Sequence, residues 1–210
     1  MRKTVEILLT GGSCAGKTTA LPLVSRSLRE HGLAVLTAPE AVTLLVSAGI
    51  PDIGGVSRTR GPACVFQREV LATQTSLRES FRRLATLFPE EEVVVLLYDR
   101  GELDGLAYHP HDCLAAALAE TGRSIEDVIR SYDAIMHLVT AADGAQNAFS
   151  STNPARWDTA EEAIAYDHVL QQIYGNHPGH TVIDNSTDFI GKMERLVHAT
   201  IEAVEQSSSH

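Results

Sequence analysis

The feature that most constrains this chain is a glycine-rich segment near its N-terminus, Gly11–Thr18, with the sequence GGSCAGKT. It matches the pattern G-x-x-x-x-G-K-[ST], follows an apolar run at Val5–Thr10 and precedes a helical pattern that begins near Lys17. Strand, glycine-rich turn and helix in this order surround a phosphate group with backbone N–H groups and a helix N-terminus. A turn matched by chance is the alternative, and the position and context of the motif argue against it.

Each residue type in this phosphate loop has an expected role. Lys17 is expected to neutralise the β- and γ-phosphates of a nucleoside triphosphate, and the Thr18 hydroxyl to ligate Mg²⁺. Cys14 is interpreted as a small space-filling residue and not as a nucleophile. The predicted nucleotide-binding residues of the loop are Gly11, Gly12, Ser13, Cys14, Ala15, Gly16, Lys17, Thr18 and Thr19.

Apolar runs of strand length alternate with helical patterns along the chain. The strand candidates are Val5–Thr10, Ala34–Ala38, Val93–Tyr98, Ala134–Thr140 and Thr181–Asp184. Several are apolar nearly throughout, as in strands buried on both faces of a parallel sheet. We predict a three-layer α/β/α fold with a five-stranded parallel sheet in the order 2-3-1-4-5. Strands 1 and 3 are expected to be neighbours because both should supply groups to one magnesium site.

The helical patterns and the loops complete the expected organisation. Apolar residues from Phe66 to Phe88 form one stripe of a long helix, and a C-terminal helix is expected to have Thr187 or Asp188 as its cap. We expect a single domain over residues 1–205, with a lid segment at about 141–159 and a disordered tail at 206–210.

Composition excludes several classes of protein. The 210 residues include 17 Lys and Arg against 27 Asp and Glu, for a net charge of −10, which argues against a protein that coats nucleic acid or an anionic membrane. Three scattered cysteines do not suggest a disulfide framework and fit a reducing compartment. With no recognisable signal peptide or membrane span, a cytoplasmic protein is expected. The sequence leaves a homodimer open.

A second group of candidates lies where predicted strands end. Asp99 follows the third strand, at the sheet edge where ligands collect in open α/β folds, and is expected to hold Mg²⁺ directly or through water. Arg100 is expected to contact a phosphate or the acceptor substrate. Glu40 follows the second strand and either accepts or orients the proton of an attacking hydroxyl, or is an acidic residue favoured in a first helical turn.

Two long polar segments carry further basic candidates. Arg156 lies in the second of them and either stabilises the transferring phosphoryl group or is a surface arginine. The predicted acceptor-binding residues are Arg58, Arg60, Arg68 and His109. Arg68 could equally be a solvated helix residue paired with neighbouring glutamates. His109 belongs to a His, Asp and Cys group at 109–113 whose spacing matches no structural zinc pattern, and a loop entering a helix at Cys113–Glu120, capped by Asp112, is the favoured interpretation.

The nucleotide base is expected to contact the segment after the fifth strand, with Asn185 and Thr187 as its predicted ligands. The guanine-reading pattern N-K-x-D is absent, so the sequence does not choose between ATP and GTP.

Taken together, these motifs resemble those of the AAA_28-type family of P-loop proteins, which includes stand-alone bacterial ATP-binding proteins and the P-loop half of triphosphate-tunnel-metalloenzyme fusions. The resemblance runs from about Thr4 to Ile201 and rests on the segments LLTGGSCAGKTT, APEA, FQREVLATQ, YDRGELDGLAY, YDAIMHLVTAADGA, NPARWDTAEEA and HTVIDNSTDF. It implies a fold similar to those of nicotinamide riboside kinases and deoxynucleoside kinases. It also implies binding of ATP or GTP.

Two functions fit these residues. The first is a small-molecule kinase that transfers the γ-phosphoryl group of Mg-ATP or Mg-GTP to a hydroxyl of a small, nucleoside-like or other metabolite. The second is a nucleotide-dependent switch that acts through a protein partner. A nucleic-acid kinase or helicase is disfavoured by the charge and by the lack of a basic groove with aromatic residues.

Overall fold

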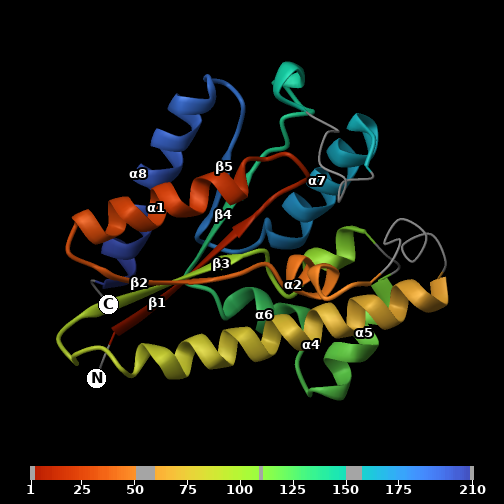
Figure 1. Ribbon diagram of the computed structural model, residues 1–210, viewed down its shortest axis with the longest axis horizontal. Helices are drawn as coiled ribbons and strands as arrows, with labels where there is room; N and C mark the ends of the chain where they lie inside the picture. Colours follow the sequence, from red (N-terminus) through yellow and green to blue (C-terminus); the bar gives the residue numbers. More distant parts are fainter. Residues whose placement is uncertain (1–2, 51–59, 109–110, 150–157, 209–210) are drawn as a thin grey trace.

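The structure is a computed structural model that describes residues 3–50, 60–108, 111–149 and 158–208 (Figure 1). Arg58, His109 and Arg156 lie outside the described residues. The elements are β1 (Lys3–Thr10), α1 (Lys17–Glu30), β2 (Ala34–Ala38), α2 (Ala41–Ser47), α4 (Arg60–Ala85), β3 (Val93–Asp99), η1 (Asp104–Ala107), α5 (His111–Glu120), α6 (Ile125–Arg130), β4 (Ala134–Leu138), η2 (Gln146–Ala148), α7 (Ala160–Tyr174), β5 (His180–Ile183) and α8 (Phe189–Ser208).

The five strands form one parallel sheet in the order β2-β3-β1-β4-β5, which confirms the predicted topology. The pairing of β1 with β3 sets Leu9 opposite Asp99, and the pairing of β1 with β4 sets Thr10 opposite His137. In this register the phosphate loop leaves the sheet directly beside the end of β3. Asp99 therefore lies beside the phosphate loop, at the carboxyl edge of the sheet.

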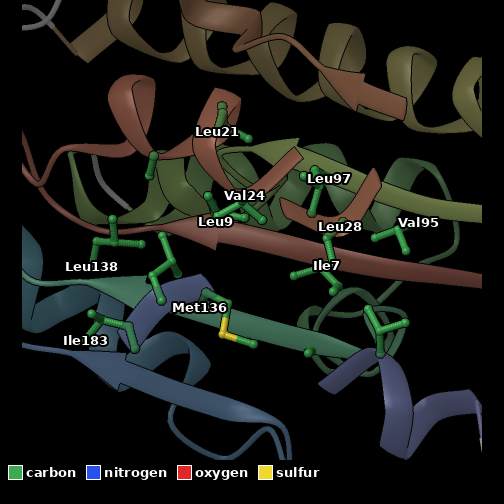
Figure 2. Packing of buried hydrophobic residues seen from close by; sticks show 14 of the residues in the cluster. Ile7, Leu9, Leu21, Val24, Leu28, Val95, Leu97, Met136, Leu138 and Ile183 are labelled. Atoms are coloured by element: carbon green, nitrogen blue, oxygen red, sulfur yellow. The ribbon is translucent and has the colours of Figure 1, made fainter. Parts of the chain in front are cut away.

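Alternate residues of each strand face opposite helical layers, because successive side chains of a strand point to opposite faces. Ile7 and Leu9 pack with Leu21, Val24 and Leu28 of α1 in a cluster that also includes residues of α8 (Figure 2). Leu8 belongs to a second cluster, on the other face, with residues of α4, α5, α6 and α7. Figure 1 shows α1 and α8 on one side of the sheet and α4 and α6 on the other. The molecule has the three layers that the alternation of elements predicts.

A buried network of ion pairs ties α4 to the sheet and to the segment after β3. Arg78 of α4 is 2% exposed and donates to Glu6 of β1 at 2.7 Å and to Glu102 at 3.0 Å. Its guanidinium carbon lies 3.9 Å from the centre of the Tyr132 ring. Arg123 donates to both carboxylate oxygens of Glu102, at 2.5 and 3.0 Å. Because each buried charge has a partner of opposite sign, the network fixes the start of the segment that carries the candidate site.

Three expectations about local structure need correction. Helix α8 continues to Ser208, so the described residues 206–208 are helical and not a disordered tail. Helix α5 begins at His111, which places Asp112 inside its first turn and not at its cap. Cys64 of α4 and Cys113 of α5 form a disulfide, with their Cα atoms 5.5 Å apart. Their separation of 49 residues hides this pairing from a reading of spacing alone.

The expected cap of the last helix is confirmed at one of its two candidates, because Asp188 Oδ1 accepts from the backbone N–H of Gly191 at 2.9 Å. Among the described residues, no helix combines the length and the apolar character needed to cross a membrane.

Candidate active site

The phosphate loop joins β1 to α1 through a tight turn in which three residues have a positive φ. These are Gly11 at 130°, Cys14 at 58° and Gly16 at 92°, the last being the N-cap of α1. A Cβ atom on Gly11 would lie 2.0 Å from the backbone oxygen of Leu138, so a side chain at this position would collide with β4. Glycine at position 11 therefore lets the loop turn tightly against the neighbouring strand.

Lys17 is buried at the start of α1, and its ammonium group lies under the loop. Its Nζ donates to the carbonyl oxygens of Gly11 at 2.6 Å and Gly12 at 2.8 Å. Burial, assisted by the charge of Arg100, lowers the pKa of Lys17 to about 7, although Asp99 and Glu40 act in the opposite direction. A site that disfavours a bare ammonium in this way is suited to an anionic ligand, which restores the balance of charge. Thr18 and Thr19 follow with exposed side chains.

Asp99 ends β3 with its side chain almost buried, at 8% exposure. Burial raises the pKa of its carboxyl to about 6, with Glu40 and Asp104 adding to the rise and Lys17 and Arg100 opposing it. A bound cation would reduce the electrostatic repulsion between Asp99 and the neighbouring carboxylates, and carboxylate oxygens are ligands that Mg²⁺ prefers.

Thr18 and Asp99 are the residues that would hold Mg²⁺. The described residues contain no group of three or more His, Cys, Asp or Glu side chains arranged to bind a metal ion. This fits Mg²⁺ at a phosphate site, because that ion usually takes one or two protein carboxylates, with phosphate oxygens and water completing its shell.

Glu40 and Arg100 meet beside this position. Glu40 is the N-cap residue of α2 and is separated from β2 by Pro39 alone. Arg100 directly follows Asp99 in a left-handed conformation with φ 67°. Arg100 Nε donates to Glu40 Oε1, and Thr43 donates to the other oxygen of Glu40 at 2.5 Å. Burial alone would raise the pKa of Glu40, but Arg100 and Thr43 outweigh it and lower the pKa below its usual range. Glu40 is therefore an ionised group that can accept a hydrogen bond from a substrate hydroxyl.

Asp104 connects the segment around Arg100 to β1 and α7. It is 3% exposed and accepts from Thr10 Oγ1 at 2.9 Å and from Tyr174 Oη at 2.8 Å, while Arg100 Nη1 lies 3.8 Å away. Arg100 Nη1 also donates to Tyr108 Oη at 3.1 Å. Sequence reasoning missed Asp104, although its position four residues after Arg100 and its place in the run DRGELD are visible in the sequence.

Sequence reasoning missed two more features of the segment that follows Arg100. The rings of Tyr108 and Tyr166 lie 4.7 Å apart, which joins this region to α7. Gln67 of α4 is 6% exposed, and its buried Oε1 has no hydrogen-bond partner among the described residues. Gly105 lies directly against it, because a Cβ there would be 2.2 Å from this oxygen. An aromatic pair and a buried amide can contact a planar, polar molecule.

Other predicted residues are placed elsewhere or are already occupied. Arg68 forms a two-contact ion pair with Glu120 at 3.0 and 2.6 Å on the surface of α4 and α5, as the alternative interpretation held. Arg60 lies in the first turn of α4 and is exposed.

The predicted base-binding pair also has internal partners. Asn185 Nδ2 donates to the carbonyl oxygens of Thr140 at 2.7 Å and Asp143 at 2.5 Å, and its Oδ1 accepts from Lys192 Nζ at 2.8 Å. Thr187 Oγ1 accepts from Arg195 at 3.1 Å. Their role in nucleotide binding stays a prediction, and in this structure Asn185 holds loops together.

The solved structures with a similar fold include two of deoxyadenosine kinase from M. mycoides. The structure with bound dATP is 12% identical, covers 94% of this chain and 99% of its own, and has a TM-score of 0.57. The structure with the products dCMP and a flexible dCDP is 14% identical, covers 94% of this chain and 100% of its own, and has a TM-score of 0.61. At such identities the likeness shows a shared P-loop kinase fold.

No curated protein matches this sequence significantly. A family does match: the sequence profile of AAA_28, described as an AAA domain, covers residues 6–191, from the middle of β1 to the first turn of α8. The match spans the phosphate loop, Asp99, Arg100 and Glu40, whose arrangement has been described above, and the chain belongs to the AAA_28 family.

Proposed function

We propose that this protein is a phosphotransferase that moves the γ-phosphoryl group of Mg-ATP or Mg-GTP to a hydroxyl of a small, nucleoside-like metabolite. The observation that carries the proposal is that groups suited to a nucleoside triphosphate and groups suited to an acceptor substrate lie at the same edge of the sheet. Lys17 and Asp99 are suited to phosphates and Mg²⁺, and the Glu40–Arg100 pair lies beside them. A protein that only binds a nucleotide has no need of the second set.

The division of labour follows from the charges. Lys17 would bind the β- and γ-phosphates, and the bound metal would supply further neutralisation of their negative charge. Glu40 would accept a hydrogen bond from the acceptor hydroxyl and aim its oxygen at the γ-phosphorus. Since Arg100 keeps Glu40 ionised and weakly basic, Glu40 would orient the hydroxyl first and accept its proton late in the reaction, as the new bond to phosphorus forms. Because phosphoryl transfer depends mostly on positioning and charge neutralisation, these residues are chemically sufficient.

The nucleoside-like nature of the acceptor is supported by Tyr108, which accepts a hydrogen bond from Arg100, and by Gln67, which lies against Gly105 in the same segment of the chain. A planar ring could lie against the Tyr108 and Tyr166 rings, and an amino group could donate to Gln67 Oε1, which has no partner among the residues described. The net charge of −10 also suits a small acceptor better than a nucleic acid.

The test is a search for the product. Purified protein is incubated with a metabolite extract and Mg-ATP or Mg-GTP, and mass spectrometry identifies any compound that gains one phosphoryl group. The proposal expects a phosphorylated nucleoside or related metabolite that is absent when the nucleotide is left out. If nucleotide hydrolysis is slow and independent of the extract, with no phosphorylated product, the chain is a nucleotide-dependent switch instead.

A further inference from the structure

We propose that Asp167 of α7 is a positioning residue for the phosphate loop, which acts on Lys17 through the Gly11–Gly12 peptide. This inference rests on the proposed role of Lys17 in binding phosphate. Asp167 is 1% exposed and lies 155 residues from Gly12 in the chain, so no sequence motif connects the two.

The Asp167 carboxylate is surrounded by hydrogen-bond donors. Its Oδ1 accepts from the backbone N–H of Gly12 at 2.7 Å and of Thr140 at 3.1 Å. Its Oδ2 accepts from Gln171 Nε2 at 3.0 Å, and His137 Nε2 lies 3.1 Å away. Burial alone would raise the pKa of Asp167, but His137, the Gly12 N–H group and Gln171 together lower it. A buried, ionised carboxylate of α7 thus accepts a hydrogen bond from the backbone of the phosphate loop.

One peptide plane connects this carboxylate to the catalytic ammonium. The N–H of Gly12 and the carbonyl of Gly11 belong to the same peptide, and all described peptides are trans, so the two groups point in opposite directions. The N–H donates to Asp167 at 2.7 Å, and the carbonyl accepts from Lys17 Nζ at 2.6 Å. Fixing one end of the plane therefore fixes the direction of the other, and bonds in such a chain polarise each other.

Helix α7 packs closely against the Gly12 end of this peptide. A Cβ on Gly12 would lie 2.9 Å from Asp167 Oδ1 and 3.1 Å from the Ala163 carbonyl oxygen, so α7 lies directly against the loop. Asp158, just before α7, accepts from Ser13 Oγ, and Thr140 Oγ1 donates to the Ser13 carbonyl at 2.5 Å. The first half of the phosphate loop is thus held by α7, by Asp158 before it and by Thr140 after β4. The Gly12 N–H group donates to Asp167 and not to phosphate.

The first test observes the loop without any ligand. In Asp167→Asn the amide oxygen can still accept from Gly12 and Thr140, but the charge is gone. Solution NMR should show changed signals for the Gly12 amide and for Cε and Nζ of Lys17, the latter identified by their loss in Lys17→Met. Asp133→Asn is the matched control, because Asp133 also accepts from a backbone N–H at 2.7 Å, that of Glu6 in β1 and not one of the phosphate loop. The control should leave the Gly12 and Lys17 signals in place.

The second test measures Mg-ATP affinity by displacement of a fluorescent ATP analogue. Asp167→Ala should weaken binding about ten-fold, as expected for loss of a hydrogen bond to a charged group, and Asp167→Asn should weaken it less. When Lys17 is already replaced by Met, neither Asp167 substitution should weaken Mg-ATP binding much further, because Asp167 acts on nucleotide binding through Lys17.

The inference would be overturned if the NMR signals of Lys17 stay in place in Asp167→Asn while the Gly12 amide signal shifts. It would also be overturned if the losses of Mg-ATP affinity caused by the Asp167 and Lys17→Met substitutions add fully when the two are combined. If Asp167→Ala does not fold, the same comparison of single and double variants is made with Asp167→Asn. A wild-type protein that fails to bind Mg-ATP would refute the proposed function, and the NMR comparison would still decide whether Asp167 acts on Lys17.

Discussion

Glu40 and Arg100 form an ion pair that joins the ends of the neighbouring strands β2 and β3, and both side chains are more than three-quarters buried. The pair holds an ionised carboxylate beside Lys17 and Asp99, with its pKa below the usual range. Such a group is a good hydrogen-bond acceptor and a weak base. The predicted roles of the site residues can be separated by substitution.

The Glu40→Gln protein should bind Mg-ATP almost as tightly as wild type, because the substitution keeps the shape of the side chain. Phosphorylation of the acceptor should fall by about 10²–10⁴-fold, the usual contribution of a side chain that accepts the proton of the reacting group. Calorimetric titration of the nucleotide and the rate of product formation measure the two effects. Thr43→Ala, which removes only a hydrogen bond to Glu40, should have a much smaller effect. A fully active Glu40→Gln enzyme would refute the catalytic role of this residue.

For Asp99, we expect the Asn variant to require at least about ten-fold more Mg²⁺ for half-maximal activity, because a neutral amide is a poorer ligand for a hard cation than a carboxylate. Titration of the rate with Mg²⁺ at saturating ATP gives this value. Nucleotide binding measured with EDTA present should change little. An unchanged Mg²⁺ requirement would remove Asp99 from the metal site.

The network around Glu102 predicts a large difference between two glutamates. The Glu102 side chain is fully buried and paired with Arg78 and Arg123, so Glu102→Ala should lower the free energy of unfolding by about 3–5 kcal/mol. Glu120→Ala breaks the exposed pair with Arg68 and should cost about 0–1 kcal/mol. Urea denaturation measures both. Similar losses in the two variants would contradict the assignment of the Glu102 network as a buried support.

Glu102 also predicts a dependence of stability on pH. Burial alone would raise its pKa, but Arg123, Thr75 and Arg78 lower it below 4.5. A carboxyl group whose pKa is lower in the folded state than in the unfolded state stabilises the fold fully above pH 4.5. This contribution is lost as the pH falls through the lowered pKa. Glu102→Gln should therefore show a shallower loss of stability than wild type below pH 4.5, in thermal melts across this range. If the melting temperatures of the two proteins fall in parallel as the pH is lowered, Glu102 does not contribute this pH dependence.

Local features of the sequence predicted most of the fold and the positions of several residues of the candidate site. The apolar runs identified the strands, and the expectation that Asp99 lies beside the phosphate loop identified the neighbours β1 and β3. Lys17, Asp99, Arg100 and Glu40 became candidates because each lies at or just after the end of a strand, or within a motif. Side chains at strand ends are placed by the sheet itself, so their neighbours can be inferred without knowledge of helix packing.

The remaining parts depend on which helix face meets which loop. Asp167 and Gln67 lie in the middle of helices, where nothing local distinguishes them from other polar residues. The disulfide between Cys64 and Cys113 likewise requires α4 and α5 to lie side by side. Asn185 was correctly placed after β5, but its bonds to the carbonyl groups of Thr140 and Asp143 follow from tertiary packing.

The most direct test of the proposed phosphotransferase measures γ-phosphoryl transfer from ATP to the acceptor found in the extract, in wild type and in Lys17→Ala. We expect transfer by the variant to fall below detection and its affinity for Mg-ATP to fall roughly 10–150-fold, the equivalent of one or more lost charged contacts. Circular dichroism should show an intact fold, because removing a buried ammonium does not disrupt α1. A folded Lys17→Ala protein that binds Mg-ATP and transfers its phosphoryl group like wild type would contradict the account.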